Sequence, residues 1–183
     1  MIKLAFSLVV FLFAGTVFAK EPSAFYQIDL IVFTHEETPE TASPDVTIAS
    51  PNRALALNTE RSHNLSPYHL LPISSSQLKE EYWALHRKPQ YRVLMNYTWL
   101  QPLESNKAIV LPKISHDGWE VEGNIKIQRL NYYVMDTQLL LTHANTNQNP
   151  FVFAQKQRLR GGEIYYFDHP QAGMLIKVHQ LKA

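Results

Sequence analysis

Three basic residues alternate near the end of the chain, in the segment with the clearest binding chemistry. Lys156, Arg158 and Arg160 occupy every second position, and a glycine pair follows at 161–162. If this segment is a strand, its two-residue period places the three cationic side chains on one face, about 7 Å apart. Such a row suits an anionic ligand, because a guanidinium group can bind a carboxylate through two parallel hydrogen bonds. The alternative is a solvated edge strand, on which Lys and Arg also prevent unwanted strand pairing.

Aromatic residues near this row could add flat binding surfaces. Tyr165 and Tyr166 follow the glycine pair, while Trp99 and Gln101 lie near the end of an earlier strand-like segment. These four residues complete the set of candidate ligand-binding residues. The aromatic face to which Trp99 belongs also fits a sheet core, which the more polar opposite face of that segment favours.

The remaining polar motifs favour structural roles. Asp168 and His169 could orient a base or a metal ligand, but neighbours on a strand point to opposite faces. With Pro170 next, a turn in which Asp168 accepts backbone N–H groups is the preferred interpretation, and residues 116–117 are interpreted in the same way. The eight histidines are scattered, and the His-Glu-Glu run at 35–37 is the best of the weak metal candidates. We therefore expect no catalytic residue, no metal and no cofactor.

The first 19 residues have the pattern of a cleavable secretory signal. Lys3 precedes an apolar run at 4–13, and small residues lead up to Ala19. The run is shorter than the roughly 20 apolar residues that span a bilayer, and no later segment matches it, so no stable membrane insertion is expected. The chain has no cysteine, which argues against a disulfide framework, a thiolate site and a lipid anchor. The sequence predicts an exported, soluble, non-lipidated protein.

Charge is sorted along the chain rather than uniform. Without Lys3, the predicted mature chain at 20–183 has 16 basic and 16 acidic residues. Residues 20–60 hold two basic and seven acidic residues, whereas residues 123–183 hold seven basic and three acidic ones. The zero net charge argues against nucleic acid as a partner.

Hydrophobic periodicity predicts a single α+β domain at 20–183: a mainly antiparallel sheet of five to seven strands with one helix packed on a face. The helix is expected near residues 75–87, capped by the serines at 74–76 and ended by Pro89. A Pro-rich connection at about 34–72 should wrap an edge of the sheet, with a short strand near 46–48 or 54–57. Residues 124–141 look like one long strand with a bulge or bend near Arg129. Further strands are expected at 26–33, 91–101, 151–160, 163–167 and 174–178, and a hairpin turn at 116–118.

Four segments in this order resemble the CsiV family of periplasmic peptidoglycan-binding proteins. They read YQIDLIVFTHEE, YRVLMNYTWLQP, EGNIKIQRLNYYVMDTQLLL and QRLRGGEIYYFDHPQAGMLIKV, and together they extend from Phe25 to Val178. The most specific part runs from Arg158 to Gly173.

The resemblance implies an exported protein that is not an enzyme and that binds peptidoglycan. It further implies support of cell-wall synthesis and cell shape, together with an outer-membrane lipoprotein activator of a bifunctional penicillin-binding protein. The alternative is a periplasmic adaptor that binds a protein partner without contacting the wall. Wall hydrolysis is a third hypothesis, and it would need paired carboxylates or a metal in a cleft.

Overall fold

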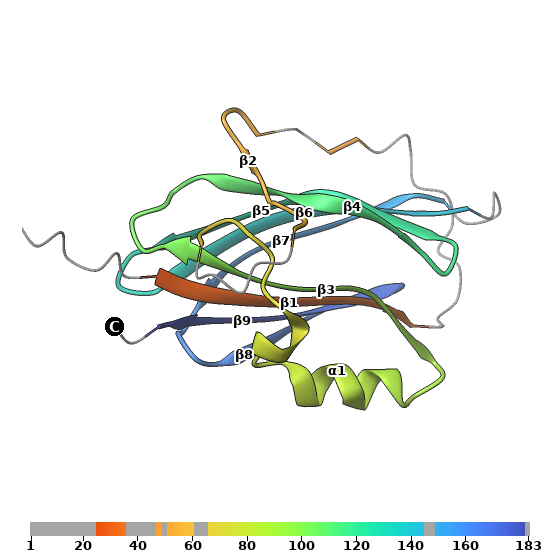
Figure 1. Cartoon of the computed structure of the whole chain (residues 1–183). Coiled ribbons are helices and arrows are strands. Elements are labelled where there is room, and N and C mark those ends of the chain that lie inside the picture. The colour runs from red at the N-terminus through yellow and green to blue at the C-terminus, as the bar shows by residue number, and fades with distance from the viewer. Residues whose placement is uncertain (1–24, 36–46, 49–50, 61–65, 145–148, 182–183) are drawn as a thin grey trace, which may run out of the picture.

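The computed structural model describes residues 25–35, 47–48, 51–60, 66–144 and 149–181. Within these ranges the chain forms two β-sheets stacked face to face, with one helix on the outside of the smaller sheet (Figure 1). The predicted signal at 1–19 lies outside the described residues. Among the residues that are described, no helix is long and apolar enough to cross a membrane.

The four-stranded sheet, sheet A, has the order β3-β1-β9-β8, and the five-stranded sheet, sheet B, has the order β2-β4-β5-β6-β7. Every pairing is antiparallel except the short parallel contact of β2 with β4. The strands are β1 Phe25–His35, β2 Leu55–Ala56, β3 Tyr91–Pro102, β4 Ala108–His116, β5 Trp119–Arg129, β6 Tyr133–His143, β7 Phe151–Leu159, β8 Ile164–His169 and β9 Ala172–Gln180.

The core lies between the two sheets. Along β5 and β6 buried and half-buried residues alternate up to the last residue of each strand, which is the pattern of a sheet with one covered face. By contrast β1 is buried at nearly every position, because sheet B covers one of its faces and the helix and its preceding segment cover the other. The prediction of one sheet with five to seven strands was wrong, because the described residues form two sheets with nine strands in total, whereas a helix packed on a sheet face is confirmed.

Two expected elements differ from the structure. The apparent long strand at 124–141 is a hairpin of β5 and β6, so the change of phase near Arg129 marks a reversal rather than a bulge. The helix α1 spans only Lys79–His86, after a 3-10 turn at Ile73–Ser75. Its N-cap is Leu78, and Ser76 accepts a hydrogen bond from the Leu78 N–H instead of capping the helix.

Other elements are confirmed. The hairpin turn between β4 and β5 lies at Asp117 and Gly118, both of which have positive φ. The Pro-rich connection contributes β2, which pairs with β4 as the outermost strand of sheet B, so this part of the connection lies at a sheet edge as expected. It also bridges Leu70 to Trp99 of β3.

A buried polar cluster fixes the segment before α1 to sheet A. Asp29 on β1 is fully buried and accepts hydrogen bonds from Gln27, Thr98 and the backbone N–H of Gln77. The His179 ring contacts this cluster, with Nε2 at 2.9 Å from the Gln77 amide and Nδ1 at 3.8 Å from Asp29.

The stability of the fold should fall in mild acid partly because of His179. Burial lowers the pKa of His179 below its ordinary value of 6.5, and this effect exceeds the opposing attraction of Asp29, while Lys177 adds to the lowering. Below pH 6.5 the unfolded state therefore binds more protons at this position than the folded state, and the free energy of unfolding decreases. Urea unfolding between pH 5 and 7.5 should show a shallower pH dependence for His179→Gln than for the unchanged protein. Exposed His116→Gln is the matched control, and equal slopes for His179→Gln and the unchanged protein would contradict the assignment.

Candidate functional site

The three predicted cationic residues lie along β7, the edge strand of sheet B, and directly after it. Lys156 and Arg158 alternate with the core residues Phe153 and Leu159, so their side chains point away from sheet A, on the outer face of sheet B. Arg160 follows the last residue of the strand. All three are exposed, with side-chain exposures of 75% for Lys156 and 83% for Arg160. We call Lys156, Arg158 and Arg160 the basic row.

The basic row forms ion pairs within the protein, but these pairs leave its side chains accessible to a ligand. Lys156 Nζ lies 3.8 Å from Asp136, its direct neighbour on β6, and Arg160 lies 3.9 Å from Glu163. Both acidic partners are about half exposed, and ion pairs of this length at the surface contribute little to stability. An anionic ligand could therefore replace these contacts at small cost.

Arg158 is held in place by an aromatic ring that the sequence analysis did not select. Its guanidinium carbon lies 4.6 Å from the centroid of Tyr132, in the turn between β5 and β6. A cation over a tyrosine face at this distance is attracted by the ring. Leu130, in the same turn, is 63% exposed. Tyr132 could not be selected from the sequence, because residues 124–141 were predicted to be one strand. Only the pairing of Val134 with Arg158 places the turn between β5 and β6 beside β7.

The two tyrosines after the glycine turn point to different faces of sheet A. Tyr165 turns toward the core and approaches the basic row: its hydroxyl accepts a hydrogen bond from the Arg160 N–H at 2.8 Å and donates one to Glu163 at 3.0 Å. Tyr166 lies on the outer face of sheet A, where it stacks on Phe33 and donates to Asp168. The structure therefore associates Tyr165 with the basic row and separates Tyr166 from it.

Trp99 and Gln101 are in the interior and are withdrawn as ligand contacts. Both have no exposed surface, because they lie on the inner face of β3, opposite Ile28 and Tyr26 of β1. The Gln101 side chain donates to the carbonyl of Ile127 across the core. The alternative interpretation of this aromatic face as core is the right one for Trp99.

The polar motifs near 168 and 116 form no cluster with metal-binding geometry. Asp168 and His169 point to opposite faces of β8, and His169 stacks on Phe151 with ring centroids 4.4 Å apart. The turn differs in detail from the expectation, since it is His169 that accepts the N–H of Gln171. No group of three or more His, Asp or Glu side chains among the described residues could hold a metal ion. Positions 36 and 37 of the His-Glu-Glu run lie outside the described residues.

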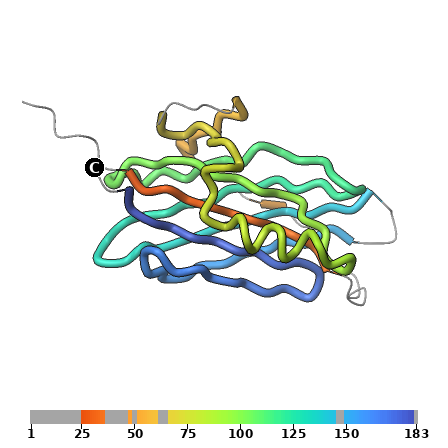
Figure 2. The backbone as a smooth tube through the Cα atoms, turned by 60° about the horizontal axis from the view of Figure 1, so that its bottom comes forward, coloured from red at the N-terminus to blue at the C-terminus, as the bar shows by residue number. Residues whose placement is uncertain are grey.

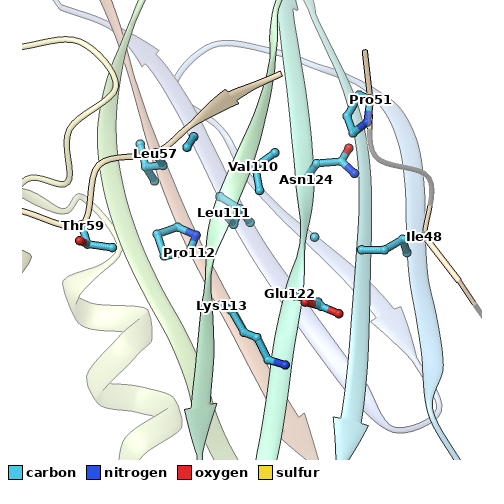
Figure 3. Close-up of a pocket in the computed structure, with 12 residues that line it drawn as sticks. Ile48, Pro51, Leu57, Thr59, Val110, Leu111, Pro112, Lys113, Glu122 and Asn124 are labelled. Carbon is cyan, nitrogen blue, oxygen red and sulfur yellow. The ribbon is translucent and has the colours of Figure 1, made fainter. Parts of the chain in front are cut away.

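A pocket opens at the opposite edge of sheet B, between β2 and strands β4 and β5 (Figure 3). Its volume is about 480 Å³, within the range of small-ligand sites. Apolar side chains dominate its lining, and Lys113 and Glu122 lie beside each other at one end. Lys113 Nζ is 2.8 Å from Glu120, and this hydrogen bond is the main cause of a raised Lys113 pKa. No motif in the sequence marks this pocket, since it depends on the parallel pairing of only two residues of β2 with β4.

A family model described as peptidoglycan-binding protein, CsiV, matches residues 3–181. The chain belongs to the CsiV family. The resemblance seen in the sequence is thereby confirmed over nearly the whole chain. Neither the curated proteins nor the solved structures contain a match to this CsiV-family protein.

A second exposed surface of this CsiV-family protein lies on the other side of the molecule. Trp83 on α1 and Ile164 and Tyr166 on β8 are each more than 40% exposed. They belong to the layer formed by α1 and the outer face of sheet A, which Figure 1 shows opposite sheet B. Exposed aromatic and aliphatic side chains of this kind are common at protein interfaces.

Proposed function

We propose that this CsiV-family protein is a non-enzymatic, periplasmic peptidoglycan-binding accessory protein that contacts the wall through the outer face of sheet B. The family match is the observation that supports the binding role most directly. The basic row adds the chemistry, because peptidoglycan presents peptide carboxylates to which arginine and lysine side chains can bind. Tyr132 orients Arg158, and Tyr165 holds the backbone of Arg160, so both arginines are partly positioned before a ligand arrives.

The proposed cellular role follows the family resemblance. Binding to the wall would support cell-wall synthesis and cell shape together with an outer-membrane lipoprotein activator of a bifunctional penicillin-binding protein. Export would use the secretory signal predicted at residues 1–19.

A second candidate function is that of a protein adaptor without direct wall contact. The exposed Trp83, Ile164 and Tyr166 favour it, because they present apolar side chains on the layer opposite the basic row. Two functions on opposite faces are compatible with each other.

Removing two arginines of the basic row should weaken binding to the wall. We expect the Arg158→Ala, Arg160→Ala double variant to sediment with purified sacculi about tenfold less strongly than the unchanged protein, because two exposed ionic contacts are together worth roughly 1.4 kcal/mol after solvent screening. Binding of the unchanged protein should also decrease as salt increases. Sedimentation at two salt concentrations measures both effects.

The matched control is the Lys79→Ala, Arg87→Ala double variant, which removes two charges near α1 on the opposite side. Equal binding by the two double variants would keep the function and exclude the basic row as its site. If the unchanged protein does not sediment with sacculi at either salt concentration, the adaptor becomes the better candidate. Soluble fragments released from labelled sacculi would instead indicate hydrolysis and contradict the non-enzymatic proposal.

A further inference from the structure

The pocket between β2, β4 and β5 has a floor suited to small apolar groups. Six residues provide it: Ile48, Pro51, Leu57, Val110, Leu111 and Pro112. Val110 remains 37% exposed, although it belongs to a strand whose neighbours Ile109 and Leu111 are in the core. Transfer of a methyl or larger aliphatic group from water to this floor is favourable by roughly 0.8 kcal/mol per carbon group buried. Among the described residues that line the pocket none is aromatic, so the pocket lacks the flat ring on which a sugar would stack.

One end of the pocket offers both signs of charge. Lys113 on β4 and Glu122 on β5 lie side by side there, and Glu122 is close enough to act electrostatically on Lys113 (Figure 3). An ammonium group has three donors, so the Lys113–Glu120 contact leaves Lys113 able to bind a further carboxylate. Glu122 can accept a hydrogen bond from an amino or amide group. This combination is complementary to a peptide rather than to a neutral glycan.

The pocket and the basic row lie on the same face of sheet B. Asn124 lines the pocket and lies opposite Gln138 on β6, which lies opposite Ala154 on β7, two residues before Lys156. From β4 to β7 there are three strand spacings, or about 15 Å. A branched polymer with peptides attached to a glycan could therefore contact the pocket and the basic row at the same time.

We propose that this pocket binds the peptide part of peptidoglycan, with a small apolar side chain on the floor and a neighbouring carboxylate or amino group at Lys113 and Glu122. The proposal rests on the proposed function and deepens it, because it assigns recognition to the stem peptide instead of the sugar chain. The basic row then binds carboxylates of the same or a neighbouring stem.

Amidase digestion of sacculi supplies the probes, because it separates free stem peptides from peptide-free glycan chains. In calorimetric titrations of the whole protein we expect binding of the free peptides. Val110→Trp should weaken that binding about tenfold or more by filling the pocket, which corresponds to a loss of roughly 1.4 kcal/mol. Glu122→Gln keeps the shape and removes the charge, and we expect it to weaken binding several-fold. Val152→Trp is the matched control, since it places the same bulk on the same face outside the pocket.

Three results would overturn the pocket assignment while leaving wall binding intact. These are peptide binding that is unchanged in both Val110→Trp and Glu122→Gln, equal weakening by Val152→Trp, and binding of peptide-free glycan chains without binding of free peptides. If Val110→Trp fails to fold, Glu122→Gln decides alone. Failure of the unchanged protein to bind intact sacculi would instead overturn the proposed function itself.

Discussion

Replacing Gly123 by alanine is expected to lower the free energy of unfolding by about 3 kcal/mol or more, since the added Cβ would overlap with backbone atoms of the neighbouring strand. A Cβ at this position would lie 2.1 Å from the carbonyl oxygen of Gln138 and 2.8 Å from Cα of Leu139, both on the neighbouring strand β6. Neither atom belongs to a flexible side chain, so relief requires separation of β5 from β6. The same residue pairs with Leu111 on β4, next to the register shift between Leu111 and Ile114. The strain would therefore fall in the centre of sheet B.

Gly162→Ala is the control for the effect of a lost glycine. Gly162 has a φ of +86°, but no atom lies within 4 Å of the position that its Cβ would take. We expect it to cost only about 1–2 kcal/mol, which is the penalty for a left-handed backbone. Urea denaturation of both variants measures the difference. If the two variants are equally stable, the close approach of β5 and β6 at Gly123 is not rigid.

The sequence predicted the positions of most strands, because these segments have a clear two-residue period. On β7 the two-residue period separates the buried Phe151, Phe153 and Leu159 from Lys156 and Arg158, which share the other face, and Arg160 directly follows the strand. The two-residue period does not reveal which layer of the protein covers each face of a strand. Trp99 was selected as a flat aromatic surface near the end of its strand, yet sheet B covers its side chain completely.

Contacts between elements distant in the chain explain the other differences. Tyr132 contacts Arg158 only because β6 pairs with β7, and the pocket exists only because residues 55–56 return to β4. Tyr165 and Tyr166 are adjacent in sequence, but the pleat of β8 directs them to opposite faces. The residue pattern along one strand indicates which side chains share a face of that strand. The residues that meet in a site depend in addition on which strands pair with each other.

Asp29→Ala should lower the free energy of unfolding by about 2–4 kcal/mol. The carboxylate has no exposed surface and accepts hydrogen bonds from Gln27 at 3.0 and 3.2 Å, from the Thr98 hydroxyl at 2.9 Å and from the Gln77 N–H at 3.3 Å. Truncation to alanine removes the acceptor that these buried and partly buried donors share, and each donor left unsatisfied in the interior costs roughly 1–3 kcal/mol, although the costs do not add fully. Gln27 also donates to the carbonyl of Ser75, so the loss should loosen the segment that leads into α1.

Two measurements distinguish this role from a general effect of losing a carboxylate. Asp136→Ala removes an acidic residue that is half exposed on the outer face of sheet B, and we expect it to change the free energy of unfolding by no more than about 0.5 kcal/mol. Hydrogen exchange should become faster at residues 73–86 in Asp29→Ala while the amides of β5 and β6 keep their relative protection, because Asp29 joins the helix segment to sheet A alone. Unchanged exchange at residues 73–86, or an Asp29→Ala variant as stable as Asp136→Ala, would show that other contacts hold α1 on the sheet. In that case the burial of Leu78 beside Ile31 would be the main attachment of the helix.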